Sequence, residues 1–163
     1  MPIDYNMGGM NIHTCTFAGH ADVYSTSVDR ALSEAIDSFI YESDEAVFYV
    51  GGRGEFDKMA ASAVRAAKSR NPDKKIRLYL VEPYMERRLN TDKTYYEQTY
   101  DGVLIPEELI GVHPKAAIKK RNRLMVDWSD TLIAFVYRDF GGAYETLQYA
   151  RRSGRIRIVN LAE

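Results

Sequence analysis

The chain has 163 residues, 45% of them apolar and 28% charged, and its 22 Lys and Arg against 23 Asp and Glu leave a net charge of −1. This length predicts about one domain, and this composition excludes a disordered or collagen-like chain. The balanced charge gives no overall attraction to DNA, RNA or acidic lipid, so we do not expect a nucleic acid partner.

Several features of the chain favour a cytoplasmic protein. The sequence has no apolar run of about 18 residues, and its first residues have neither a basic flank nor an apolar signal core, so we expect no membrane partner. The single cysteine, Cys15, lies in an apolar run, which favours a buried, unreactive thiol. Residues 1–10 show no periodicity and predict a loose N-terminal arm before a single domain over residues 11–163.

Short apolar strands and amphipathic helices alternate through the first half of the chain. Residues 14–17 predict a strand, and the apolar residues between 28 and 40 recur at helical spacing. Residues 46–50 predict a second strand, and a glycine-rich turn over 51–54 leads into a helix that ends before Asn71-Pro72. This order is typical of βαβ units around a parallel sheet.

The second half of the chain continues the pattern after one irregular segment. Residues 76–81 predict a third strand, and the tyrosine-rich segment 83–101 predicts a partly helical excursion or lid. Strands are expected over 102–105, 131–136 and 156–159, with helices starting at Pro114 and at Gly141-Gly142. The sequence therefore predicts an α/β fold, a single Rossmann-like three-layer domain with a mainly parallel sheet of five to six strands flanked by helices.

Three glycine turns follow predicted strands and precede predicted helices. They are Gly19 with His20, the turn at Gly51 and Gly52, and Gly141 with Gly142. Glycine allows a close approach of the backbone to a phosphate, and a helix N-terminus attracts negative charge. Because the carboxyl ends of parallel strands share one edge of the sheet, the three turns predict a ligand site there. The spacing is neither GxGxxG nor a P-loop.

The helix that starts at Pro114 has two polar residues, Arg121 and Asn122, in its apolar stripe. A buried guanidinium needs a partner, because an unpaired buried charge costs several kcal/mol. The partner could be an internal acid, Asp127, Asp130 or Glu82, or the phosphate or carboxylate of a ligand.

Acidic, histidine and tyrosine side chains supply further candidates. Asp57 and Glu145 lie in first helical turns, where a carboxylate also stabilises the helix. Glu82 could accept hydrogen bonds from ribose, and His20 could contact the ligand, transfer a proton or simply pack. Tyr95, Tyr96 and Tyr100 could stack on a base or make structural or dimer contacts. His13 and His113 have no neighbours at metal-ligand spacing, so we expect no metal site and no cofactor.

Four segments together resemble the YpsA-like branch of the SLOG superfamily, which is named for the SMF/DprA and LOG (Lonely Guy) proteins. The segments are residues 14–20, Gly52 with Phe56-Asp57, residues 121–130, and Gly141-Gly142 with Thr146 and residues 149–151. The resemblance implies a Rossmann-like sheet that binds nucleotides or nucleotide-derived ligands, with several relatives acting as sensors. The DprA relatives imply DNA binding as an alternative.

Two enzyme families resemble shorter parts of the chain. Residues 118–122 are similar to the MHxRK segment of LOG phosphoribohydrolases, which places Arg121 on their catalytic arginine. Their PGGxGTxxE segment is not reproduced, since Tyr149 stands where the glutamate should be. Residues 129–150 are similar to nucleoside deoxyribosyltransferases, whose nucleophilic glutamate falls near Glu145. Arg121, Glu145 and Glu82 would be the catalytic residues if the protein cleaves or transfers an N-glycosidic bond.

The main functional expectation is a sensor or regulator that binds an ADP-ribose-like, NAD-like or nucleoside phosphate ligand at the carboxyl edge of the sheet. The alternatives are the N-glycosidic enzyme and a DNA-binding, DprA-like module. We expect a small-molecule partner and a homodimer. The expected ligand-binding residues are Gly19, His20, Gly51, Gly52, Phe56, Asp57, Glu82, Arg121, Asn122, Asp130, Gly141, Gly142 and Thr146.

Overall fold

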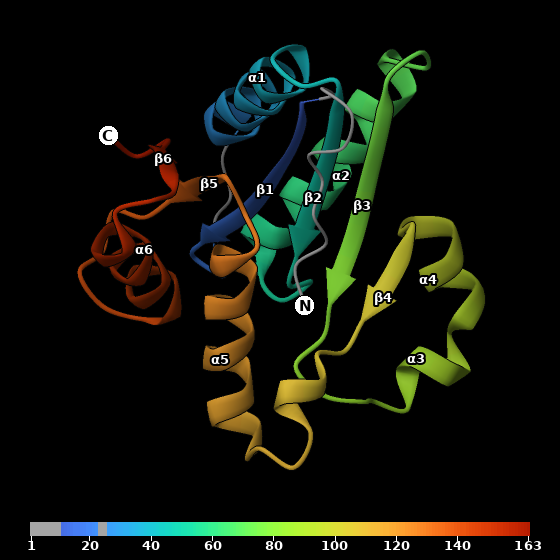
Figure 1. Ribbon diagram of the computed structural model, residues 1–163, viewed down its shortest axis with the longest axis vertical. Coiled ribbons are helices and arrows are strands. Elements are labelled where there is room, and N and C mark those ends of the chain that lie inside the picture. Colours follow the sequence, from blue (N-terminus) through green and yellow to red (C-terminus); the bar gives the residue numbers. More distant parts are fainter. Residues whose placement is uncertain (1–10, 23–25) are drawn as a thin grey trace.

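The computed structural model describes residues 11–22 and 26–163, so the expected arm over residues 1–10 lies outside the described residues. The described chain forms one α/β domain with a parallel six-stranded sheet between helices, as the sequence predicts (Figure 1). Its elements are β1 (Ile12–Gly19), α1 (Thr26–Tyr41), β2 (Glu45–Val50), α2 (Glu55–Arg70), β3 (Lys75–Val81), α3 (Arg88–Thr91), α4 (Lys93–Thr99), β4 (Gly102–Leu104), η1 (Glu107–Leu109), α5 (Pro114–Asp127), β5 (Thr131–Phe135), α6 (Gly142–Ser153) and β6 (Arg157–Asn160).

The strand order places a change of direction in the middle of the sheet. The order is β4-β3-β2-β1-β5-β6, so the chain moves outward from β1 to β4 and then returns to β5 on the other side of β1. The β1 and β5 strands are paired from Cys15↔Thr131 to Gly19↔Phe135. In parallel sheets ligands bind beyond the carboxyl ends of the strands at such a reversal. The fold therefore points to the ends of β1 and β5.

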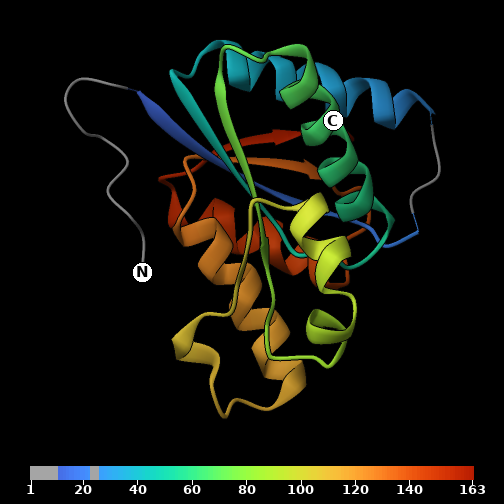
Figure 2. The ribbon, with the colours of Figure 1, turned by 90° about the vertical axis from the view of Figure 1, so that its right-hand side faces the viewer.

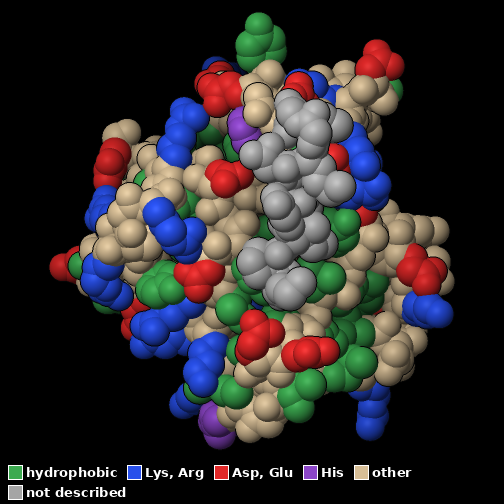
Figure 3. Space-filling view, viewed as in Figure 1, with side chains coloured by type: hydrophobic (Ala, Val, Ile, Leu, Met, Phe, Trp, Pro, Cys, Tyr) green, Lys and Arg blue, Asp and Glu red, His purple; other side chains and the backbone are tan. Residues whose placement is uncertain are grey.

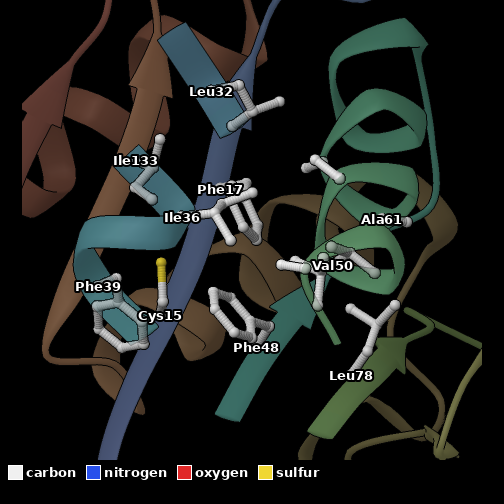
Figure 4. Packing of buried hydrophobic residues seen from close by; sticks show 14 of the residues in the cluster. Cys15, Phe17, Leu32, Ile36, Phe39, Phe48, Val50, Ala61, Leu78 and Ile133 are labelled. Atoms are coloured by element: carbon white, nitrogen blue, oxygen red, sulfur yellow. The ribbon is translucent and has the colours of Figure 1, made fainter. Parts of the chain in front are cut away.

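Helices cover both faces of the sheet. Figure 2 shows α1 and α2 on one side of the strands and α5 and α6 on the other. The expected apolar stripe of α1 is confirmed, because Leu32, Ile36 and Phe39 are buried. They point toward Cys15 and Phe17 of β1 (Figure 4). Burial raises the pKa of the Cys15 thiol, so the thiol stays protonated and unreactive at neutral pH.

The predicted excursion over 83–101 is partly helical, as expected, and contains α3 and α4 (Figure 1). Tyr96 is buried, while Tyr95 is 57% exposed and its ring meets that of Tyr96 edge-on. Tyr96 and Tyr100 line a separate hollow of about 330 Å³ beside β4. The three tyrosines thus belong to the edge of the sheet at β4, away from the ends of β1 and β5.

Several strand ends differ from the sequence prediction by one or two residues, among them those of β5 and β6. The structure ends β5 at Phe135 and starts β6 at Arg157, one residue from the expected limits in each case. At Val136 the side chain of Asn160 replaces the backbone ladder, since its Oδ1 accepts from Val136 N at 3.0 Å and its Nδ2 donates to Val136 O at 2.9 Å. Within the described part of the chain, no helix is long and apolar enough to cross a membrane.

Candidate functional site

A cavity of about 560 Å³ opens at the carboxyl ends of β1 and β5, and we call it the rim pocket. Four regions far apart in sequence line it: the end of β1, the start of α2, the inner side of α5, and the turn between β5 and α6. The polar and glycine residues among its lining are Gly19, His20, Asp22, Arg53, Asp57, Arg121, Asn122, Arg138, Gly141, Gly142 and Thr146. Arg121 and the glycine pair of α6 therefore face the same hollow.

The start of α6 forms an open wall of the rim pocket. Gly141 has a φ of 96°, which L side chains rarely adopt, and this turn aims the first backbone amides of the helix. A Cβ atom on Gly141 or Gly142 would meet nothing within 4 Å, so space lies directly beside this backbone. The first N–H groups of a helix have no intrahelical acceptor and favour anions. Thr146 is engaged internally, since its hydroxyl donates to Gly142 O at 2.9 Å.

Arg121 is 2% exposed and is held by three hydrogen bonds. Its Nη1 donates to Val81 O at 2.7 Å and to Gly51 O at 3.1 Å, and its Nε donates to Asn122 Oδ1 at 2.9 Å. Within the described residues its other terminal nitrogen, Nη2, has no hydrogen bond. Burial lowers the pKa of this guanidinium, while Asp57 and Glu82 act in the opposite direction. Arg121 is thus positioned by two backbone carbonyls and the Asn122 side chain, and it lines the rim pocket.

The acids considered as internal partners of Arg121 bond elsewhere. Asp127 pairs with Arg155 at 2.9 Å and accepts from the Tyr149 hydroxyl at 2.7 Å. The Asp130 carboxylate accepts from Thr14 N at 2.8 Å at the amino end of β5, on the edge of the sheet opposite the rim pocket. The structure therefore does not bring Asp130 into the pocket.

Asp57 brings a carboxyl group with a shifted pKa to the rim pocket. Burial raises its pKa to about 6, against the opposing effects of Arg121 and of the backbone amides of Arg53 and Gly51. A Cβ atom on Gly51 would lie 3.0 Å from Asp57 Oδ2 and 3.0 Å from Arg121 Cζ. Gly51 is therefore wedged between the two charged groups, and its role is to let them approach the same turn.

The neighbouring glycines serve the packing of the turns. Gly52 has a φ of 69°, and a Cβ atom there would lie 2.6 Å from Leu80 Cδ1. A Cβ atom on Gly19 would come within 2.2 Å of the ring of Phe56, which is fully buried. Neither Gly52 nor Phe56 lines the rim pocket, and the Phe56 ring instead fixes how closely α2 approaches β1.

His20 lines the rim pocket but already uses one ring nitrogen. Its Nε2 accepts from Tyr137 N at 3.2 Å and from Arg138 N at 3.3 Å, so it ties the turn after β5 to the end of β1. Burial, and then the positive charge of Arg138, lower the pKa of the ring. A neutral imidazole with its proton on Nδ1 fits these contacts, and Nε2 is not free to take up a proton from a ligand.

Glu82 and Glu145, the expected acids of an enzyme, do not meet at the pocket. Glu82 is 1% exposed and lies between Arg53, at 3.4 Å, and Arg88, at 3.2 Å. Burial raises its pKa, and these two guanidinium groups act against that rise. Glu145 is exposed and pairs with Lys119 at 3.4 Å. Glu82 is close enough to Arg121 to affect its pKa but is enclosed by Arg53 and Arg88, whereas Glu145 lies apart at the surface, so the structure does not gather Arg121, Glu82 and Glu145 into one catalytic group.

Sequence reasoning missed two arginines of the rim pocket. Arg53 contacts Glu82 and Glu86 and lies over the Tyr84 ring, while Arg138 makes a bidentate pair with Asp22 at 2.9 and 2.8 Å. Both follow the carboxyl end of a strand, Arg53 after β2 and Arg138 after β5. Their positions directly after strands could have assigned both arginines to the site, because the carboxyl ends of parallel strands meet at one edge of the sheet.

A second hollow of about 210 Å³ runs between α5 and α6, and we call it the α5–α6 groove. Its charged lining residues are Lys115, Lys119, Arg123 and Glu145. It shares Ile118, Asn122, Gly142 and Thr146 with the rim pocket, so the two hollows adjoin. Figure 3 shows Lys and Arg side chains gathered over α5 and α6, at the lower left. Cations thus extend from the groove to Arg121, Arg53 and Arg138.

No family model and no curated protein matches this sequence. Solved structures do match, among them DNA processing protein A (DprA) from Streptococcus pneumoniae and from Helicobacter pylori, each with a TM-score of 0.61 and 17% identity. The matches cover 88% and 89% of this chain but only 48% and 63% of those chains. The described chain shares their fold and spans about half to two thirds of their length.

These neighbours bear on two expectations. The DprA proteins are one namesake of the SLOG superfamily, so the fold implied by that resemblance is confirmed. The H. pylori structure is described by its single-stranded DNA binding mode, and this overturns the expectation that nucleic acid is not a partner class for this fold. The expectation was wrong because net charge averages over the whole chain and hides the cationic lining of the α5–α6 groove.

Proposed function

We propose that this domain binds single-stranded nucleic acid along a path formed by the α5–α6 groove and the rim pocket. The observation that carries the proposal is that the two hollows share lining residues, which joins Lys115, Lys119 and Arg123 to the arginines of the rim pocket. The likeness of the fold to DprA supports the class of ligand. Binding of single-stranded nucleic acid therefore replaces binding of a small-molecule ligand as the leading functional proposal.

The chemistry of the path suits a phosphate backbone. Arg53 and Arg138 are already held by carboxylates, so a phosphate can replace one anionic partner with another. The amides at the start of α6 add donors that need no side chain. A single strand fits this arrangement because its backbone is flexible enough to enter a pocket between secondary-structure elements.

The test compares cations inside the groove with cations outside it. We expect Lys115→Ala combined with Arg123→Ala to weaken binding of a fluorescein-labelled 12-nucleotide dT strand at least about 10-fold at low salt. The slope of log K against log salt should fall by about 1.4, since each phosphate contact on a single strand contributes about 0.7. Fluorescence anisotropy over a salt series measures both quantities.

The matched control is Lys58→Ala combined with Arg65→Ala, which removes two exposed cations from α2 on the other face of the sheet. Its affinity and salt slope should equal those of the wild type. Absence of binding at about 20 mM salt would contradict the proposal. So would an equal loss in both double variants, because the charge would then act without a defined path.

A second candidate function is the binding of a free nucleotide-derived ligand in the rim pocket. A volume of about 560 Å³ lies within the usual range for small-molecule sites, and the YpsA-like resemblance of residues 121–130 supports this candidate. A thermal-shift panel of mononucleotides, NAD and ADP-ribose tests it. At 100 times Kd a ligand adds about 2.7 kcal/mol, which raises Tm by roughly 5–10 °C for this size. An unchanged Tm with every compound would exclude it.

A further inference from the structure

We infer that Phe140 is a base-stacking residue that holds one nucleobase of the bound strand; the inference rests on the proposed function and adds a subsite to it. Phe140 lines the rim pocket and is 65% exposed. It directly precedes Gly141 and Gly142, whose backbone opens onto the same space. An exposed aromatic ring thus stands at the edge of a pocket that also contains the charged side chains of Arg53, Arg121 and Arg138.

Tyr137 shows what distinguishes Phe140. Tyr137 is similarly exposed, at 59%, but its ring meets His20 edge-on at 4.6 Å and lies 5.0 Å from the Arg138 guanidinium. Its hydroxyl also accepts from Arg138 at 2.8 Å. For Phe140, by contrast, the described residues provide no ring or cation contact. Its face is available to an external ring.

Phe140 differs from other exposed apolar side chains in its position at the rim pocket. Single exposed apolar side chains are common on protein surfaces and need no explanation. The other strongly exposed apolar side chains of the described chain, such as Tyr41, Met85 and Ile110, do not line the rim pocket. Phe140 alone among them adjoins both the α6 amides and the pocket arginines. A nucleotide whose phosphate lies at the start of α6 would therefore hold its base near Phe140.

The subsite also explains why a single strand is the expected form. A base inside a duplex is covered on both faces by its neighbours, whereas an unstacked base of a single strand can lie against an aromatic side chain. Stacking on a ring tolerates any base, because every base has a π-face. We therefore expect binding that prefers single strands over duplexes and depends weakly on sequence.

The test separates bases from phosphates with two strands of equal length, a 12-nucleotide dT strand and an abasic strand with the same backbone. Phe140→Ala should weaken binding of the dT strand about 5- to 140-fold, which corresponds to ~1–3 kcal/mol per stacked base. It should leave the abasic strand and the salt slope unchanged. Tyr95→Ala is the matched control, because it removes an exposed aromatic ring from α4 and should change neither affinity.

A conservative variant gives a direct readout. Phe140→Trp should keep the affinity for the dT strand, and its added fluorescence should be quenched on binding. The chain has one natural tryptophan, Trp128, which packs against Tyr49 and supplies the background measured in the wild type. Circular dichroism melting should show equal Tm values for both Phe140 variants and the wild type, since the side chain contributes little buried surface.

The outcomes distinguish this inference from the proposed function. If the wild type binds neither strand, the proposed function fails. If the wild type binds the dT strand and Phe140→Ala binds it equally well, the stacking role is wrong and the proposed function stands. A change of oligomeric state in Phe140→Ala, measured by size-exclusion chromatography with light scattering, would identify Phe140 as a protein contact and overturn the inference.

Discussion

The helices α2 and α5 cover opposite faces of the same sheet, yet they bury different chemistry. In α2 the face packed against the sheet is apolar and Phe56 is completely enclosed, while Asp57, in the first turn, lines the rim pocket. In α5 a buried arginine, Arg121, interrupts the apolar positions Ala117, Met125 and Val126. A buried guanidinium is retained against its desolvation penalty only where hydrogen bonds hold it. Thus α2 mainly stabilises the fold, whereas α5 has a charged side chain in place of an apolar one and so positions a guanidinium at the rim pocket.

The largest expected effect tests whether the buried residues of α2 stabilise the fold without taking part in binding. Phe56→Ala should lower the free energy of unfolding by about 3–5 kcal/mol, because it empties a fully enclosed site against β1. Urea denaturation measures the loss. Binding of the dT strand by the remaining folded protein should be unchanged. A weakened strand affinity would place Phe56 in the binding site, as the sequence analysis expected, and would remove the contrast with α5.

The next largest effect tests whether Arg121 of α5 contributes to strand binding. Arg121→Met should lower the stability by roughly 1–3 kcal/mol, since the carbonyls of Val81 and Gly51 lose their donor while the apolar volume is kept. Its affinity for the dT strand should fall at least about 10-fold, because the pocket loses a cation. Denaturation and anisotropy on the same preparation provide the two values. Full affinity in Arg121→Met would show that the buried charge serves the fold alone.

The smallest effect concerns Asp57, the one residue of α2 that faces the pocket. Its pKa of about 6 in the folded protein lies above the ordinary 3.8, so the folded state binds more protons than the unfolded state between about pH 4 and 6. Stability from this group should therefore fall as the pH rises through that window. Protonation also removes a negative charge beside Arg121 and Arg53.

Strand binding should follow the same titration. We expect affinity for the dT strand to be roughly 5-fold higher at pH 5.5 than at pH 7.5, a Coulomb effect of ~1 kcal/mol. Anisotropy at constant ionic strength checks this, with Asp57→Asn as the comparison, in which the dependence should flatten. An equally steep profile in Asp57→Asn would assign the titration to another group and leave α2 without a part in binding.

Much of the fold could be predicted because its signals are local. The stripe of α1, the apolar strand β2 and the Pro114 start of α5 each follow from residues near one another in the chain. The rim pocket was predicted in part: the glycine turns at Gly19 and Gly141 do line it. Asp130 and Glu82 were assigned to the same site by motif and strand position, but Asp130 lies at the opposite edge and Glu82 is enclosed by two arginines.

The sequence by itself determined where the helices and strands lie and which of their faces are buried, because burial periodicity depends on neighbours three or four positions away in a helix and two in a strand. Only the tertiary structure decided which charges meet. Arg121 bonds to Gly51 and Val81, which lie 70 and 40 residues away, and the α5–α6 groove joins two helices separated by β5. Such pairings depend on strand order and helix packing, which no local pattern encodes.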